Sequence, residues 1–366
     1  MATLSLLDID ANLRQTLNIP EDTLFFDALS APFACYGLPD HACVPPCRLP
    51  PAVLEQASPQ LRALSYHTAG VRVRFATDAS AIHLAAELYE KCLFPHMPLT
   101  GTSGIDVFSD GYYRSTVRPG FDPDGSPALR YMGSVTLPGS GLKQVTLYLP
   151  LYNGIRSLSV GLPPKALLQP GTGYRLDKPV LFYGSSITQG GCACRTSTCY
   201  TALVSRWLDV DHINLGFSGN ALGEPFMARY IASLPLAALV LDYDHNAPDA
   251  AHLTRTHGPF FDIIRASQPQ LPVLMMSRPD FVAGDPEMEA RRAAVRDTYE
   301  KAQAAGDRQV WFLDGETLLE GRDRSGCTVD GCHPNDLGFM RMAQRVEPLL
   351  RQMLGFQVAN INPCGT

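Results

Sequence analysis

Two short polar clusters contain the residue types needed for acyl transfer. One holds adjacent serines, Ser185 and Ser186, and the other holds Asp330 with His333 three residues later. A serine hydroxyl attacks an acyl carbon when a histidine accepts its proton, and a carboxylate keeps that histidine in the right tautomer. A tight turn can bring Asp330 and His333 together. These residues therefore predict a serine nucleophile served by a histidine base.

Two further clusters contain groups that could stabilise the negative charge formed in such a reaction. Gly219 lies in the sequence FSGN, and Asn246 lies in DHNAP. A tetrahedral intermediate needs preorganised hydrogen-bond donors around its oxyanion, and each donor is typically worth about 3 kcal/mol. We expect three donors here: the backbone N–H groups of Ser186 and Gly219, and the side-chain amide of Asn246.

The elements that position these clusters are expected from residue 180 onward. Nearly continuous apolar runs predict buried strands at 180–184, 213–217, 237–244, 272–278 and 310–315. Helices are expected near 200–208, 222–232, 250–266, 286–304 and 336–353. Buried strands that alternate with helices favour a doubly wound α/β domain with a parallel sheet. Such a sheet gathers the segments that follow its strands at one edge, where ligands bind.

The preceding part of the chain has a β-rich pattern. Apolar and basic residues alternate over 71–77, as in a half-buried strand. Further β-rich runs separated by turn sequences lie at 104–108, 134–137, 144–149 and 157–162. This pattern predicts an antiparallel β-sandwich of jelly-roll type. Proline and glycine interrupt 163–179, so we expect an accessory domain at 1–165 and a catalytic domain at 175–366.

The four polar clusters together resemble the SGNH (GDSL-type) hydrolase superfamily over roughly residues 178–355. In that family the first block supplies the nucleophile, the next two complete the oxyanion hole, and the last supplies the acid and base. Carried over by position, these are Ser186, Gly219, Asn246, Asp330 and His333. The resemblance implies a flavodoxin-like three-layer α/β/α catalytic domain. A preceding β-sandwich resembles a subgroup with carbohydrate esterases and related acyltransferases.

The chain departs from the family pattern at some positions. Ser185 stands where the family usually has aspartate, and Asp244 and Ala247 replace a glycine and an acid around Asn246. Ser185, His245 and Arg278 are candidates for substrate binding. Each also has a plainer interpretation: Ser185 as a turn residue, His245 as a structural or surface residue, and Arg278 as the counter-ion of Asp242 or Asp244.

The resemblance implies a serine esterase acting through an acyl-serine intermediate. A short acyl group, acetyl in particular, on a carbohydrate or glycoside is the expected substrate. An acyltransferase, a thioesterase or lysophospholipase, and a carbohydrate-binding protein with a decayed site remain as alternatives. The mechanism requires no metal or organic cofactor. Attack needs a neutral histidine, so activity should rise with pH through roughly 6 to 7.

Composition narrows the class of partner and location. The 366 residues carry a net charge of -6. We see no cluster of basic residues of the kind that binds nucleic acid, so we expect no nucleic-acid partner. We see no signal peptide and no apolar run long enough for a membrane span, which predicts a cytoplasmic protein without a membrane partner. The oligomeric state is left open.

The cysteine-rich run CACRTSTC at 192–199 raises the question of zinc. Structural zinc usually takes paired knuckles, and the second pair is missing in this run. Reduced thiols are therefore favoured over a metal site or a disulfide beside the active site.

Overall fold

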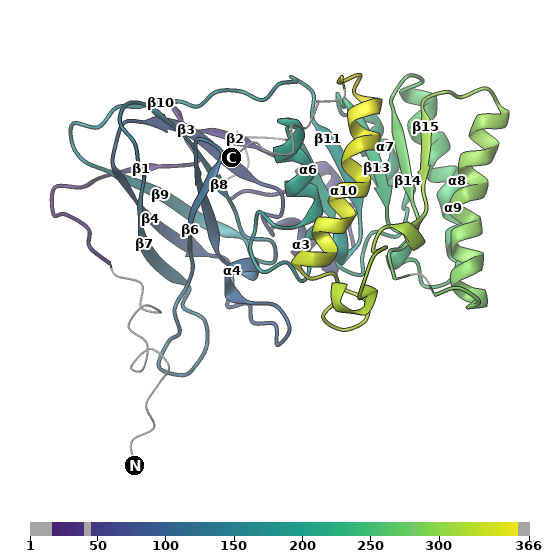
Figure 1. Ribbon diagram of the computed structural model, residues 1–366, viewed down its shortest axis with the longest axis horizontal. Helices are drawn as coiled ribbons and strands as arrows, with labels where there is room; N and C mark the ends of the chain where they lie inside the picture. The colour runs from purple at the N-terminus through teal and green to yellow at the C-terminus, as the bar shows by residue number, and fades with distance from the viewer. Residues whose placement is uncertain (1–16, 40–44, 281, 358–366) are drawn as a thin grey trace, which may run out of the picture.

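The computed structural model describes residues 17–39, 45–280 and 282–357. Figure 1 shows a β-rich part at the left and a part with alternating strands and helices at the right. The strands of the left part precede residue 171, and those of the right part begin at residue 180.

The right-hand part is built on a parallel sheet of five strands in the order β12-β11-β13-β14-β15. The strands are β11 (Val180–Gly184), β12 (His212–Gly216), β13 (Ala238–Asp242), β14 (Val273–Met276) and β15 (Val310–Leu313). Numbered within this part, the order is 2-1-3-4-5, which is that of flavodoxin-like sheets. Every residue of the first three strands is buried, as apolar parallel strands require.

Helices cover both faces of this sheet, as Figure 1 shows. The longer helices are α6 (Tyr200–Leu208), α7 (Pro225–Ser233), α8 (Ala250–Ser267), α9 (Pro286–Ala304) and α10 (Asp336–Met353). Along β11, Val180 and Phe182 join the core that α6 and α10 cover, while Leu181 and Tyr183 join the core under α7, α8 and α9. The alternation follows from the two-residue period of a strand.

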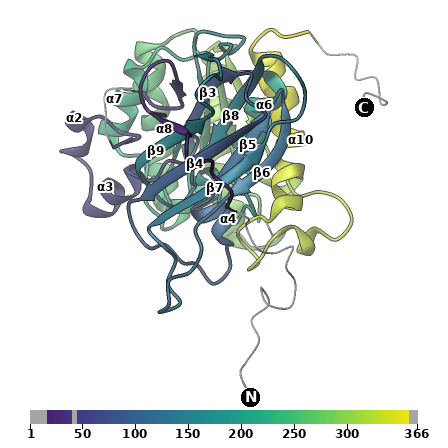
Figure 2. The ribbon, with the colours of Figure 1, turned by 90° about the vertical axis from the view of Figure 1, so that its left-hand side faces the viewer.

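The left-hand part contains two antiparallel sheets, whose strands cross the view of Figure 2. One has the order β1-β9-β4-β7, from β1 (Leu24–Asp27), β9 (Ile155–Leu162), β4 (Ala81–Leu88) and β7 (Arg130–Thr136). The other has the order β10-β3-β8-β5-β6, with β2 also paired to β3. Its strands are β10 (Leu168–Pro170), β3 (Arg72–Thr77), β8 (Lys143–Tyr148), β5 (Ile105–Ser109), β6 (Tyr112–Val117) and β2 (Ala34–Tyr36).

The two antiparallel sheets share one hydrophobic core. Leu84 of β4 and Val160 of β9 lie in the same buried cluster as Phe75 of β3 and Leu147 of β8. The described residues before 171 also contain the short helices α2 (Pro51–Leu54), α3 (Pro59–Ser65) and α4 (Leu99–Thr102). Val53 of α2 and Leu61 of α3 join the core under α7, α8 and α9. The jelly-roll topology and the domain bounds 1–165 and 175–366 stay predictions.

The expected strands and helices of the parallel-sheet part are present. Their ends match the expectation at 180–184, 200–208, 286–304 and 336–353, and the other elements have shifted ends. The second strand begins at His212 and ends at Gly216, and the helix expected from residue 222 begins at Pro225. In the β-rich part, β1, β2, β4, β6 and β10 were not expected. None of the helices in the described ranges is both long and apolar enough to cross a membrane.

Candidate active site

The predicted serine and oxyanion residues follow three adjacent strands at one edge of the parallel sheet. Gly184, the last residue of β11, lies opposite Gly216 of β12 on one side and Asp242 of β13 on the other. The three strands therefore end at the same level. Short segments then lead from these ends to Ser186, Gly219 and Asn246, as expected for a parallel sheet.

The nucleophile turn is compact because glycine precedes it. Ser186 begins the short helix α5 (Ser186–Gln189), and the Ser185 hydroxyl caps that helix by accepting the Ile187 N–H at 3.1 Å. A β-carbon on Gly184 would lie 2.1 Å from the Thr188 hydroxyl oxygen, so a larger residue would push the helix away. Ser185 is 1% exposed. Its position fits the plainer interpretation, that of a turn residue.

Ser186, His333 and Asp330 form a continuous hydrogen-bonded chain. The Ser186 Oγ lies 2.9 Å from His333 Nε2, and His333 Nδ1 lies 2.8 Å from Asp330 Oδ2. A carboxylate only accepts hydrogen bonds, so the Nδ1 of a neutral His333 carries the proton. Nε2 is then free to accept the proton of the Ser186 hydroxyl. This is the arrangement that activates a serine nucleophile.

The loop that carries Asp330 and His333 is organised around the aspartate. Asp330 Oδ1 accepts the backbone N–H groups of Cys332 at 3.0 Å and His333 at 2.7 Å. Partial burial alone would raise the pKa of Asp330, but the hydrogen bonds from His333 and Cys332 outweigh it and lower the pKa to about 2. Asp330 is therefore ionised at every pH at which the protein would work. Just beyond the loop, Asn335 caps α10.

The predicted oxyanion residues lie together, but two of their donors are already engaged. The Gly219 N–H donates to Asn246 Oδ1 at 3.1 Å, and Asn246 Nδ2 donates to the Phe217 carbonyl at 2.8 Å. An amide nitrogen has two hydrogens, so one hydrogen of Asn246 remains for an oxyanion. As the first helical residue, Ser186 has an N–H without a partner inside α5. The Gly219 N–H must leave Asn246, or be shared, to reach the same oxyanion.

His245 and Arg278 are held by protein groups. His245 Nε2 lies 2.8 Å from Cys332 Sγ, and burial lowers the pKa of His245 to about 4. The Arg278 guanidinium donates to both carboxylate oxygens of Asp280 at 2.6 Å. The partner of the Arg278 side chain is therefore Asp280, not Asp242 or Asp244, the two aspartates considered in the sequence. His245 contacts Cys332 of the catalytic loop, which favours a structural role.

Arg48 supports the oxyanion segment and was not singled out in the sequence. Its side chain is fully buried and donates to the carbonyls of Asn214 and Gly216 in β12, at 2.9 and 2.7 Å, and to that of Leu64. The guanidinium carbon also lies 4.5 Å from the centre of the Phe217 ring. Burial lowers the pKa of Arg48 to about 9. Because the buried guanidinium is bound to these carbonyls, it holds the end of β12 in place just before Gly219.

The β-rich part also contacts the nucleophile helix directly. The Tyr152 hydroxyl donates to the Ser186 carbonyl at 3.2 Å. Gln189 donates to the Leu151 carbonyl at 3.0 Å, lies 3.1 Å from His67 Nδ1, and accepts the Ser218 N–H at 3.0 Å. Gln189 thus connects the β-rich part, the nucleophile helix and the turn that holds Gly219.

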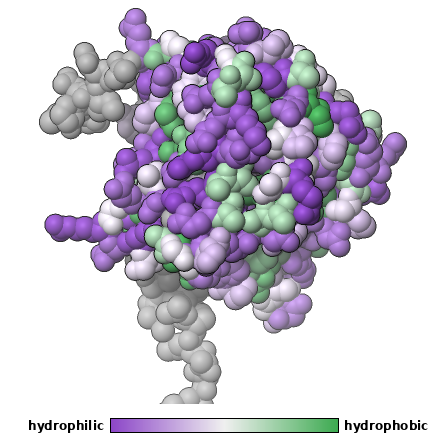
Figure 3. Space-filling model, turned by 90° about the vertical axis from the view of Figure 1, so that its right-hand side faces the viewer, coloured by the Kyte–Doolittle hydropathy of each residue, from purple (hydrophilic) through white to green (hydrophobic). Residues whose placement is uncertain are grey.

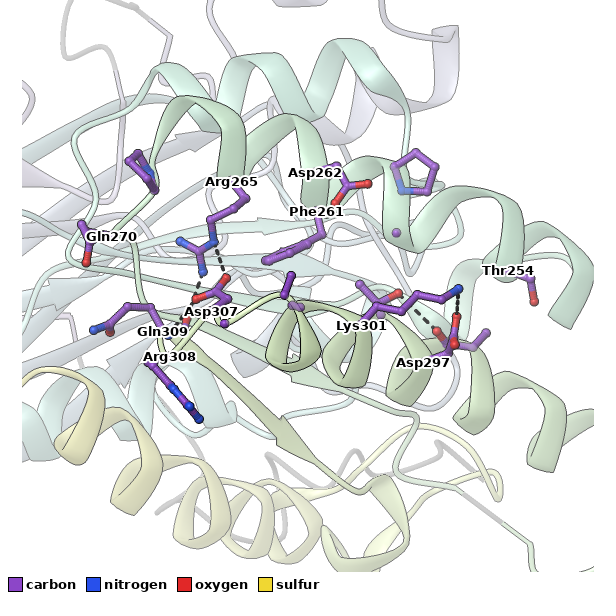
Figure 4. Close-up of a pocket in the computed structure, with 18 residues that line it drawn as sticks. Thr254, Phe261, Asp262, Arg265, Gln270, Asp297, Lys301, Asp307, Arg308 and Gln309 are labelled. Atoms are coloured by element: carbon purple, nitrogen blue, oxygen red, sulfur yellow. Dashed lines mark hydrogen bonds and ion pairs between the residues drawn. The ribbon is translucent and has the colours of Figure 1, made fainter.

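A cavity of about 750 Å³ lies elsewhere, between α8 and α9 (Figure 4). Its lining includes residues 269–270 and 305–309, which precede β14 and β15, so it adjoins the sheet edge opposite Ser186. Arg265 faces Asp307 there at 2.7 Å, and Lys301 faces Asp297 at 2.6 Å. The charges of these two pairs offset each other, and the candidate catalytic residues lie at the opposite edge of the sheet.

The right-hand face of the molecule is largely hydrophilic, with small apolar patches (Figure 3).

Comparison with known families adds to this geometry. The GDSL-like lipase/acylhydrolase family matches residues 177–351, which include the whole candidate site. This match covers just under half of the chain. Residues 43–168 match a second family, the N-terminus of SGNH-hydrolase-type esterases. The two matches, with a GDSL-like lipase among the structural neighbours, indicate a carboxylic ester hydrolase.

Solved structures share the fold of this chain over most of its length. A GDSL-like lipase from Bacteroides ovatus is 25% identical with a TM-score of 0.81, covering 92% of this chain and 99% of its own. The salicylyl-acyltransferase SsfX3 from a tetracycline biosynthetic pathway is 23% identical with a TM-score of 0.73, covering 93% and 100%. A family two carbohydrate esterase from Clostridium thermocellum is 15% identical with a TM-score of 0.58, covering 80% and 94%. No curated protein matches the sequence.

Proposed function

We propose that the protein is a serine esterase that removes short acyl groups, acetyl above all, from carbohydrate esters. The observation that carries the catalytic part is the hydrogen-bonded chain from Ser186 through His333 to Asp330. Catalysis belongs to the predicted domain 175–366. The predicted accessory domain 1–165 supports the nucleophile helix through the Tyr152 hydroxyl and through the Leu151 carbonyl, which accepts a hydrogen bond from Gln189.

Ser186, His333 and Asp330 each have a defined role in this mechanism. His333 Nε2 takes the Ser186 proton as Oγ attacks the acyl carbon, and Asp330 stabilises the resulting imidazolium. The Ser186 N–H and the Asn246 amide donate to the oxyanion, joined by the Gly219 N–H once it leaves Asn246. His333 then protonates the leaving alcohol. In the second half it activates water, which releases the acid from Ser186.

The substrate class rests on the structural neighbours. Family two carbohydrate esterases share the fold, and one of their structures contains cellohexaose.

An acyl-length series on one alcohol tests the acyl half of the proposal. We expect kcat/KM for p-nitrophenyl esters to be highest for acetyl and to fall toward decanoyl. Acetylated xylo-oligosaccharides should release acetate at a higher kcat/KM than a simple alkyl acetate. Preference for decanoyl esters, or equal rates on sugar and alkyl acetates, would contradict the substrate assignment while leaving the serine mechanism intact.

An acyltransferase is the second candidate, because the fold is shared with a salicylyl-acyltransferase. The same acyl-serine could pass its acyl group to an alcohol instead of water. Adding a sugar or phenolic acceptor to the assay and measuring both acid and new ester by mass spectrometry separates the two. We expect free acid to dominate, and a majority of new ester would favour the transferase.

A further inference from the structure

Three side chains that bind soft metal ions meet at the catalytic base. His96, Cys192 and His333 each place a ligand atom within 4.8 Å of the other two. They come from three distant segments: the connection between β4 and α4, the loop after α5, and the loop before α10. Cys192 opens the run in which the sequence raised the question of zinc. The two further ligands that this run lacks are histidines from other segments of the fold.

The chemistry of this trio matches the sites that hold zinc with one open position. Such sites use three protein ligands, and histidine nitrogen with cysteine sulfur is a common set. Bonds of about 2.0 Å to nitrogen and 2.3 Å to sulfur separate tetrahedral ligands by roughly 3.3–3.6 Å. His96 is exposed, so its ring can turn toward the other two.

His333 is already oriented as a metal-binding histidine would be. Asp330 holds its Nδ1 at 2.8 Å, which leaves Nε2 as the ligand atom. A carboxylate on the far nitrogen is the usual partner of a zinc-bound histidine, where it fixes the tautomer and raises basicity. The Ser186 hydroxyl lies 2.9 Å from the same Nε2, so a metal bound there would replace the serine as its partner.

We propose that His96, Cys192 and His333 form an inhibitory site for a soft divalent cation, Zn²⁺ in particular. Zinc on Nε2 occupies the lone pair that accepts the Ser186 proton, so the general base is blocked while the metal is bound. Zinc binding forms the Zn–S bond and releases the thiol proton of Cys192 to solvent.

A second group of potential ligands consists of His245, Asp280 and Cys332. Its carboxylate is already neutralised, because Arg278 donates to both oxygens of Asp280 at 2.6 Å. A cation there would also meet the positive charge of Arg278. This contrast favours the His96 trio and provides a control.

Titration with ZnCl₂ of the full chain, first stripped with a chelator, tests the site by two readouts. Calorimetry measures binding and proton release without turnover, so it does not depend on the proposed esterase function. Inhibition of p-nitrophenyl acetate hydrolysis, and its reversal by chelator, measures the effect on the base. The variants are Cys192→Ser and His96→Gln, with Cys194→Ser and Cys332→Ser as matched controls.

We expect one zinc per chain in the wild type, with reversible inhibition. Loss of a group that only orients a ligand typically weakens metal binding roughly 10–100-fold, so loss of a direct ligand should weaken it at least as much. Cys192→Ser and His96→Gln should do so with basal activity near wild type, and both controls should bind as the wild type does. Exposed His96→Gln covers the case in which Cys192→Ser fails to fold. Absence of binding, equal binding by His96→Gln and wild type, or loss only in Cys332→Ser would overturn the site.

Discussion

Replacing Asn246 by alanine tests how the oxyanion is stabilised. The change removes the amide hydrogen left for the oxyanion, and it also removes the Oδ1 atom that accepts the Gly219 N–H at 3.1 Å. One donor is therefore lost while another is released. Loss of one preorganised donor typically costs about 2.7–4 kcal/mol, or roughly 100–1,000-fold in kcat. Because the released Gly219 N–H compensates in part, we expect a fall near 100-fold with little change in KM.

Asn246→Asp separates the two effects of that change. Aspartate keeps the acceptor for Gly219 but replaces the donor by a negative charge beside the oxyanion, so its kcat should fall further than that of the alanine variant. Asn220→Ala is the matched control, because Asn220 also donates to a carbonyl of this turn, that of Ser218, at 2.6 Å. Steady-state kinetics on p-nitrophenyl acetate measure all three. A kcat for Asn246→Ala within threefold of wild type would refute the donor role.

Three further changes test the elements behind the site. Arg48→Met removes three hydrogen bonds to backbone carbonyls. We expect a loss of about 3 kcal/mol in the free energy of unfolding, measured by urea denaturation. The control Arg62→Met, at an exposed residue, loses one such bond and should cost less than 1 kcal/mol. Asp330→Asn should keep the fold but lower kcat on the order of 100–10,000-fold, because the histidine loses its tautomer control; equal kcat would remove Asp330 from the mechanism. Burial raises the pKa of Asp242 from 3.8 to about 7, so the folded state favours the protonated acid and this group lowers stability as pH rises from about 4 to 7. At about 1.4 kcal/mol per pKa unit the loss is on the order of 4 kcal/mol, and Asp242→Asn, measured by urea denaturation at pH 5 and 8, should gain stability relative to wild type at the higher pH.

The sequence patterns that predicted the catalytic half are local ones. Strands such as 180–184 are continuous apolar runs because both of their faces are buried, and that is visible in a single segment. Asp330 and His333 lie within one turn, so their spacing predicts their contact. Strand β4, with the sequence AIHLAAEL, has alanines and a glutamate that do not favour a strand. Its pairing with β7 and β9 outweighs that local preference.

The supporting residues could not be predicted in the same way. Arg48 binds carbonyls of β12 that lie 166 and 168 residues along the chain, and backbone acceptors have no sequence signature. The engagement of the Gly219 N–H by Asn246 depends on a side-chain rotamer, so the motif alone does not indicate it. Contacts within one turn were therefore within reach of the sequence, while contacts between distant segments needed the fold.

Hydrolysis of p-nitrophenyl acetate by the wild type, Ser186→Ala and Ser185→Ala, measured in parallel, tests the central claim most directly. Ser186→Ala should fall to background because it removes the hydroxyl 2.9 Å from His333 Nε2. Ser185→Ala loses only a helix cap, worth about 1 kcal/mol of stability, and should keep activity within about tenfold of wild type. Background activity in Ser185→Ala together with an active Ser186→Ala would contradict the account.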